Sequence, residues 1–143
     1  DHLVSMDIIP PAIEKPKDKL ALKPFRHLLV VTENGVGKRS DVYLYPLQKR
    51  GGIGVKVANL TAKTGNIAAA QVVSETVEQV ILVSKKAVTI KLPIKNIPVL
   101  SRNTKGVILM RFKSNEDKLT AMTIIENTNQ IEEVKPTPAK KNN

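Results

Sequence analysis

The sequence of 143 residues contains no cysteine and no tryptophan, and its aromatic share is only 3%. Without cysteine there is no disulfide framework and no thiolate metal site. The two histidines, His2 and His27, lie far apart and have no ligand-spaced companions, so the sequence predicts no metal site. The scarcity of aromatic side chains also argues against a protein that stacks the bases of single-stranded nucleic acid.

Long apolar runs and targeting signals are absent as well. No apolar run approaches the roughly 20 residues that a membrane-spanning helix needs, and no signal peptide is recognisable. We therefore expect a cytoplasmic protein without a membrane partner. The sequence begins at Asp1 without an initiator methionine, and we expect it to be a piece of a longer chain.

What the sequence does contain is positive charge. Its 23 Lys and Arg residues against 13 Asp and Glu residues give a net charge of +10. A surplus of this size in a small chain favours a polyanionic partner, nucleic acid before membrane; the alternative is a solvated basic surface without a partner. The apolar residues make up 41% of the chain and are mainly Val, Ile, Leu and Ala, which favours strands over helices.

The chain repeats itself at a constant offset of 52 residues, so that residues 28–73 align with residues 80–125 without a gap. The apolar pattern matches almost throughout, as in LLVV over VILV and IAAAQVV over LTAMTII. Internal repeats of this length are typical of propeller-type folds. The identical pairs include Pro46 with Pro98, Arg50 with Arg102, Gly54 with Gly106, and Val55 with Val107.

Each repeat is predicted to form four short strands. In the first repeat these are residues 27–32, 36–40, 53–60 and 67–73, with an irregular piece at 41–52. The sequence Glu33-Asn34-Gly35 is a strong hairpin signal, because Asn-Gly accepts the positive φ angles of a tight turn. Lys85 and Lys86 occupy the matching turn of the second repeat. The predicted fold is therefore all-β, with four-stranded antiparallel, propeller-like blades.

The predicted organisation follows from the repeat. Residues 27–78 form one blade and residues 79–126 the final blade. Residues 1–9 resemble the closing strand of a repeat and are predicted to be the last strand of a preceding blade. Residues 10–26, rich in Pro and Lys, are predicted to be an inter-blade loop or linker. The polar residues 127–143 are predicted to be a disordered tail.

The stretches VTENGVGKRSDVYLYPLQKRGGIGV (residues 31–55) and SRNTKGVILMRF (residues 101–112) resemble the C-terminal blades of DNA gyrase A subunits. Similar repeats occur in topoisomerase IV A subunits, which remain the alternative. The resemblance covers nearly all of residues 1–126. It implies a β-pinwheel, a larger ring or spiral of about six blades that exchange strands and bend DNA around a basic rim. This chain would supply the last two blades.

The family's characteristic box sequence is only partly present. Gln48-Lys49-Arg50-Gly51-Gly52-Ile53-Gly54 keeps the glutamine, two basic residues and three glycines, but Ile53 replaces an expected basic residue. In the second repeat the same piece has become LSRNTKG at residues 100–106. We expect these remnants to support DNA contact without deciding whether DNA is wrapped.

Duplex DNA held without sequence preference needs Lys and Arg side chains near backbone N–H groups. Glycine loops let the backbone approach a phosphate closely; the alternative is that these glycines serve tight turns only. Of the strand pair Lys38 and Arg39, we expect Arg39 to point outward, as its counterpart Lys91 would; the alternative is that both are ordinary solvated strand charges. Lys105 would replace the charge missing at Ile53. The predicted DNA-binding residues are Arg39, Lys49, Arg50, Lys91, Arg102 and Lys105, with loop glycines Gly51, Gly52, Gly54 and Gly106.

No catalytic site is recognisable in the sequence. Tyr43 and Tyr45 lack the adjacent basic residue and the acidic metal site that cleavage of DNA by a tyrosine requires, and there is no phosphate-binding P-loop. The resemblance implies that the parent is an ATP-hydrolysing type II topoisomerase, an A2B2 heterotetramer with an ATPase subunit, whose ATP and Mg²⁺ sites lie outside this chain. The fragment would bind and help wrap double-stranded DNA. The rival from another class is a basic propeller-like scaffold that binds proteins.

Overall fold

The computed structural model describes residues 2–9 and 26–127, and their regular structure is β-strand apart from two single-turn 3-10 helices. This confirms the prediction of an all-β fold. Neither of these helical turns is long enough to cross a membrane. The elements are β1 (Arg26–Thr32), β2 (Val36–Asp41), η1 (Val42–Leu44), β3 (Ile67–Ser74), β4 (Val77–Ser84), β5 (Thr89–Pro93), η2 (Ile94–Asn96), β6 (Val107–Ile108) and β7 (Leu119–Glu126).

The constant offset of the sequence repeat reappears in the structure. Helix η2 occupies the repeat counterparts of η1, and β7 occupies the repeat counterparts of β3, with both ends matching in each pair. The first hairpin turn of each repeat is closed in the same way. The Thr32 hydroxyl accepts from the Val36 N–H at 3.2 Å in the first repeat, and the Ser84 hydroxyl accepts from the Val88 N–H at 3.1 Å in the second. The repeat is therefore a repeat of backbone geometry as well as of sequence.

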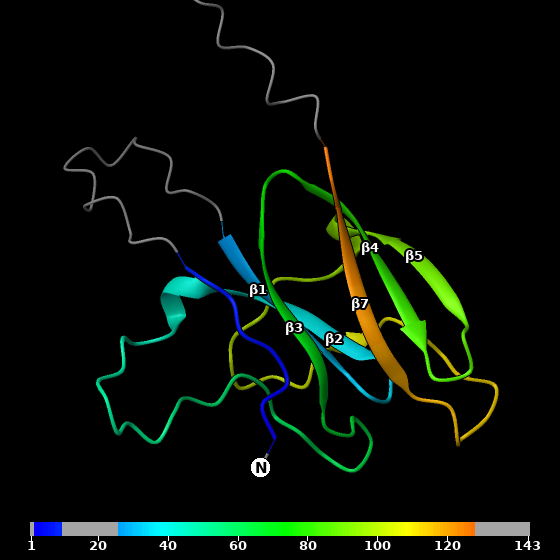
Figure 1. Cartoon of the computed structure of the whole chain (residues 1–143), viewed down its shortest axis with the longest axis horizontal. Helices are drawn as coiled ribbons and strands as arrows, with labels where there is room; N and C mark the ends of the chain where they lie inside the picture. Colours follow the sequence, from blue (N-terminus) through cyan, green and yellow to red (C-terminus); the bar gives the residue numbers. More distant parts are fainter. Residues whose placement is uncertain (1, 10–25, 128–143) are drawn as a thin grey trace, which may run out of the picture.

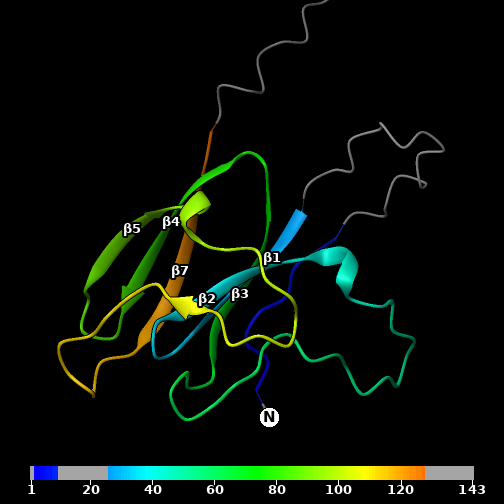
Figure 2. The ribbon, with the colours of Figure 1, turned by 180° about the vertical axis from the view of Figure 1, so that it is seen from behind.

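The strands form two antiparallel sheets, with strand orders β3-β1-β2-β6 and β5-β4-β7 (Figure 1). Strand β6 belongs to the second repeat by sequence, yet it pairs with β2 of the first repeat, in the register Val36↔Ile108 and Gly37↔Val107. Figure 2 shows β6 beside β2, away from β5. The second repeat therefore gives its third strand to the sheet of the first, which agrees with the strand exchange that the family resemblance implies.

Two segments that were predicted to be strands, residues 53–60 and residues 1–9, form no regular strand where the structure describes them. Residues 53–60 form no strand, so that prediction is wrong. Their counterpart β6 pairs with the neighbouring repeat, and the described residues contain no sheet that would receive 53–60 in the same way. Residues 2–9 form no regular strand either, but they run beside β3, where the Asp7 carboxylate accepts from the Val72 N–H at 2.9 Å. Their assignment to a preceding blade remains a prediction.

The linker predicted at 10–26 and the tail predicted at 127–143 lie outside the described residues, except for one residue of each. Arg26 is the first residue of β1. Asn127 continues beyond β7 and donates its backbone N–H to the Thr76 carbonyl at 2.8 Å.

The two sheets share one aliphatic core. Its buried members come from β1, β3, β4 and β7 and from the segments before and after β6. Ile97, before β6, and Met110, after it, belong to this core, so both segments are held against the strands. The buried core residues are Leu29, Val31, Val73, Val77, Val80, Leu82, Ile97, Met110 and Leu119.

The turn at residues 33–35 is hydrogen-bonded to three other segments of the chain. The Gly35 carbonyl accepts from the N–H groups of Leu109 and Met110 at 2.8 and 3.1 Å, and the Glu33 carbonyl accepts from the Leu119 N–H at 2.8 Å. On its other side, the Asn34 N–H donates to the Thr64 carbonyl at 3.1 Å. The predicted hairpin turn is confirmed, and it also fixes the chain after β6, the start of β7 and the turn before β3.

Gly35 and Ala87 are repeat counterparts with positive φ angles of 81° and 61°. A left-handed conformation costs an alanine about 1–2 kcal/mol. At Gly35 an added Cβ would also collide with the Met110 carbonyl. The first turn therefore requires glycine for two reasons, whereas the second tolerates alanine at a cost.

We expect Ala87→Gly to raise the free energy of unfolding by up to about 1 kcal/mol, because relief of the left-handed strain exceeds the added freedom of the unfolded chain. We expect Gly35→Ala to lower it by about 2 kcal/mol or more. Urea denaturation of both variants measures the two effects. A clear loss of stability in Ala87→Gly would contradict the strain assigned to this turn.

His27 is buried at the start of β1, where it pairs with Asp41 across the hairpin. Burial lowers the pKa of His27 below its ordinary value, the charge of Arg39 lowers it further, and Asp41 partly opposes both. The unfolded chain therefore takes up this proton at a higher pH than the folded protein does.

Because of this lowered pKa, the free energy of unfolding should fall as the pH drops below about 6.5, where an unfolded histidine becomes protonated. The loss should continue down to the pKa of folded His27. Thermal unfolding between about pH 7.5 and pH 5 measures it. His27→Gln should flatten this dependence, and His2→Gln, a change at an exposed position, should leave it as in the wild type. Equal slopes in all three proteins would show that His27 is not responsible.

Candidate nucleic-acid interface

The box remnant of the second repeat lies against the first repeat. The Arg39 N–H donates to the Pro98 carbonyl at 2.9 Å, and the Leu100 N–H donates to the Arg39 carbonyl at 2.8 Å. These bonds attach the chain before β6 to the end of β2, with Val99 bridging to Arg39. Residues 98–106 are therefore positioned by the neighbouring repeat rather than by their own.

A buried ammonium group holds the same loop from within. Lys38, on β2, is only 1% exposed. Its Nζ donates to the carbonyls of Ser101, Arg102 and Thr104 at 2.8, 2.6 and 3.0 Å and to the Thr104 hydroxyl at 3.1 Å. Burial lowers the pKa of Lys38. Lys38 is thus more buried than Arg39, and the sequence contained no signal that Lys38 reaches the loop of the next repeat.

Arg102 of this loop is half-buried. The carbon at the centre of its guanidinium lies 5.6 Å from the centroid of the Tyr45 ring, and its Nη1 donates to the Lys56 carbonyl at 3.3 Å. Burial raises the pKa of Tyr45, with the Ser40 hydroxyl and the Arg102 charge acting in the opposite direction. Arg102 therefore packs against the first repeat as well as carrying charge.

Arg39 and Lys91 differ in their surroundings although they are repeat counterparts. Arg39 is half-buried, and its Nε donates to the Ile97 carbonyl at 2.8 Å. Burial lowers the pKa of Arg39. Lys91 is exposed on β5, at the edge of the second sheet. The DNA contact predicted for both remains a prediction, and Arg39 already has a structural role.

The glycine loop of the first repeat, residues 48–54, is exposed along its length and includes Lys49 and Arg50. Its turn matches that of the second repeat, because the Gly52 N–H donates to the Lys49 carbonyl as the Thr104 N–H donates to the Ser101 carbonyl. Three of the four predicted loop glycines have positive φ angles: Gly51 at 75°, Gly54 at 81° and Gly106 at 95°. Gly106 also permits a close approach between strands, since a Cβ there would lie 2.6 Å from the Gly37 carbonyl oxygen.

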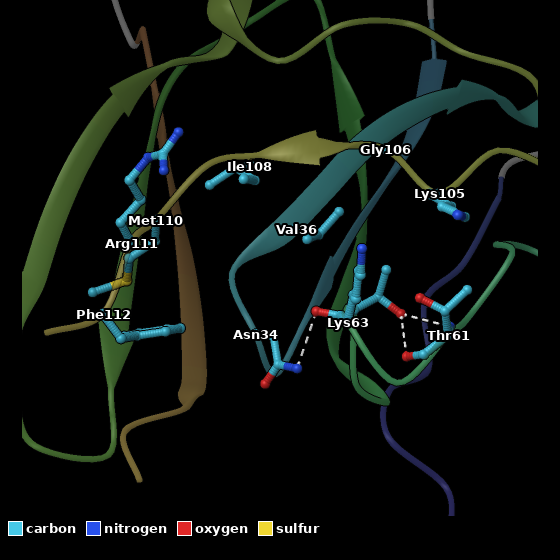
Figure 3. A pocket seen from close by; sticks show the side chains of 11 residues that line it. Asn34, Val36, Thr61, Lys63, Lys105, Gly106, Ile108, Met110, Arg111 and Phe112 are labelled. Carbon is cyan, nitrogen blue, oxygen red and sulfur yellow. Dashed lines mark hydrogen bonds between the residues drawn. The ribbon is translucent and has the colours of Figure 1, made fainter. Parts of the chain in front are cut away.

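A groove of about 500 Å³ lies between the turn at residues 61–65 and the chain around β6 (Figure 3). Three basic residues line it, Lys63, Lys105 and Arg111, and its lining contains no acidic residue. Its apolar side is formed by Ile108, Met110 and Phe112. The lining of the groove thus joins three segments of the chain: residues 34–36, the turn at residues 61–65 and residues 105–112.

The structure joins some predicted residues and separates others. Lys105 and Gly106 lie in the groove with Lys63 and Arg111, which the sequence had not singled out. Lys63 stands in the turn at residues 61–65 and Arg111 in the stretch SRNTKGVILMRF, but nothing in either pattern indicates that they line one groove. The other predicted basic residues do not line this groove; they are Arg39, Lys49, Arg50, Lys91 and Arg102. The described chain also has no group of three residues suited to hold a metal ion.

Comparison with known families gives a match to the model described as "DNA gyrase C-terminal domain, beta-propeller", over residues 26–74 and 78–126. The two matched segments have the same offset as the sequence repeat. The DNA gyrase A subunit of Thermotoga maritima is 33% identical over 126 residues, covering 88% of this chain and 14% of the relative. The DNA gyrase A subunit of Dehalogenimonas lykanthroporepellens is 37% identical over 110 residues, covering 73% of this chain and 13% of the relative.

Two solved structures share the fold. A DNA gyrase A C-terminal domain superposes with a TM-score of 0.63 at 26% identity, covering 68% of this chain and 33% of that chain. The C-terminal domain of a DNA topoisomerase IV superposes with a TM-score of 0.63 at 17% identity, covering 73% of this chain and 32% of that one. The chain therefore spans about a seventh of the length of the curated relatives and about a third of each matched domain structure.

The repeat counterparts Arg50 and Arg102 should differ in their effect on stability. We expect Arg102→Ala to lower the free energy of unfolding by about 1 kcal/mol, since it removes the Tyr45 contact and a hydrogen bond. We expect Arg50→Ala, at an exposed loop tip, to change it by less than about 0.5 kcal/mol. Chemical denaturation of the two variants provides the comparison. Equal effects would mean that the packing of Arg102 adds nothing to stability.

Proposed function

The chain belongs to the DNA gyrase C-terminal domain family, and we propose that it binds double-stranded DNA through its phosphate backbone without sequence preference. The observation that carries this proposal is the groove lined by Lys63, Lys105 and Arg111 and by no acidic residue. The positive charges of Lys63, in the turn at residues 61–65, and of Lys105 and Arg111, on either side of β6, repel one another, and a polyanion relieves that repulsion. The net charge of +10 acts in the same direction over the whole surface.

Phosphate contact is favoured over base reading by the type of side chain available. Lys63, Lys105 and Arg111 are long, exposed and charged, which suits contact with phosphates spaced along a strand. The described residues include no α-helix, the element most often used to read bases in the major groove. The exposed Lys49 and Arg50 of the glycine loop would add to the contact surface.

We further propose that the parent is an ATP-hydrolysing type II topoisomerase that works on cytoplasmic DNA. The similarity to DNA gyrase A subunits supports this, and it favours DNA supercoiling over the decatenation expected of a topoisomerase IV. In this proposal the parent is an A2B2 complex, and ATP and Mg²⁺ serve segments beyond this chain. The chain itself would support DNA bending, whose cost of several kcal/mol over 20–30 base pairs must be offset by many phosphate contacts.

The proposal predicts a steep dependence of DNA affinity on salt. If the surface touches about 4 phosphates, a plot of log K against log[salt] should have a slope near −3.6. Fluorescence anisotropy of a labelled duplex measures it. Lys63→Ala, Lys105→Ala and Arg111→Ala should each make the slope shallower by about 0.9.

Lys95→Ala is the matched control, because Lys95 is an exposed lysine in η2 that does not line the groove. It should leave the slope close to that of the wild type. A flat salt response of the wild-type chain, or a clear preference for one DNA sequence, would contradict phosphate binding.

A further inference from the structure

The buried ammonium of Lys38 fixes the orientation of three peptide groups in the box remnant of the second repeat. The carbonyls of Ser101, Arg102 and Thr104 all point toward its Nζ. The chain has no cis peptide bonds among its described residues, and in a trans peptide the N–H points opposite to the C=O of the same unit. The N–H groups of Arg102, Asn103 and Lys105 therefore point away from Lys38.

The residues that carry these three N–H groups lie at or near the surface. Ser101, Asn103 and Lys105 are exposed, and Arg102 is half-buried. None of the three N–H groups donates a hydrogen bond to another described residue. A set of oriented backbone donors without protein acceptors suits an anion.

The surrounding charge has the sign that an anion requires. Neither of the two ion pairs in the described part of the chain includes Lys38, so its charge is balanced by carbonyl dipoles and not by a carboxylate. Lys105 stands in the same loop, and the loop's other cation, the Arg102 guanidinium, lies over the Tyr45 ring. An oxyanion at the outer side of the loop would thus meet N–H donors backed by positive charge.

We propose that residues 101–105 form a phosphate-binding site whose backbone donors are held in place by Lys38 from the preceding repeat. The ligand is a phosphate oxyanion, and its source is a phosphodiester of duplex DNA. This inference rests on the proposed function. Lys38 is then a positioning residue. It does not touch DNA itself, but it orients the backbone N–H groups that contact the DNA phosphate.

The first repeat provides an internal comparison. Its glycine loop makes the same turn between Lys49 and Gly52, but no ammonium of the described residues donates a hydrogen bond to its carbonyls. The repeat counterpart of Lys38 is Ile90, which has no charge to offer a following loop. Of these two loops, the one at 101–105 should therefore be the better ordered.

The test follows backbone amides by NMR in the whole chain, with inorganic phosphate and a short DNA duplex as probes and chloride at equal ionic strength as the control. In the wild type, both probes should shift the Arg102, Asn103 and Lys105 amides, and chloride should not. In Lys38→Met, phosphate should no longer shift them. The affinity for the duplex should fall about tenfold, as expected for loss of one charge-assisted hydrogen bond.

A second readout is the susceptibility of the loop to an arginine-specific protease. Cleavage after Arg102 relative to cleavage after Arg50 should be slow in the wild type and at least about tenfold faster in Lys38→Met, which corresponds to the loss of about 1.4 kcal/mol of protection. Circular dichroism checks that the variant is folded. If it is not folded, the wild-type amide shifts alone decide.

The outcomes separate this inference from the proposed function. If the duplex shifts amides at the groove but leaves those of residues 102, 103 and 105 unchanged, the phosphate site is wrong and DNA binding stands. If phosphate shifts the three amides but the duplex does not bind, the anion site stands and the proposed function is wrong. A folded Lys38→Met that binds phosphate and DNA as the wild type does would overturn the positioning role of Lys38.

Discussion

The pairing of β6 with β2 is the interaction on which the rest of this structure depends. It joins strands from two repeats through Val36↔Ile108 and Gly37↔Val107. The pairing needs close approach of the backbones, which the glycines at 37 and 106 permit. Once β6 is in place, Met110 enters the shared core and the Gly35 carbonyl binds the chain after β6. The groove exists because β6 and the residues after it are brought beside the turn at 61–65.

The buried Lys38 shows how two repeats of similar backbone become different in detail. Burying an ammonium is costly unless its donors are satisfied. Here three carbonyls and a hydroxyl supply the acceptors, and all of them come from the following repeat. The ammonium is therefore compatible with the fold only when that loop is docked. At the counterpart position the chain has Ile90, on β5, whose outer edge has no strand beside it in the described residues.

Strand exchange also explains the unequal environments of the paired box residues. Arg102 stacks on Tyr45 because its loop is drawn onto the first repeat, whereas Arg50 lies on a loop that no described strand receives. Positive charge consequently gathers where the repeats meet, with Lys63 from one repeat and Lys105 and Arg111 from the other. In the proposed function, this junction would lie against the phosphate backbone.

The sequence by itself determined β1, β2, β3, the turn at 33–35 and the repeat. Segments rich in Val and Ile, the Asn-Gly turn and the constant offset are local signals, and these elements formed where they predicted. The basic character of the surface also follows from composition alone. Pairing partners are a different matter, because strand pairing joins residues distant in the chain and its register is set by packing. Only the tertiary structure decided that residues 107–108 cross to the other repeat and that 53–60 form no strand. It likewise placed Lys38 inside the fold and brought Lys63 and Arg111 to the lining of one groove, since a side chain's neighbours depend on which backbone segments pack around it.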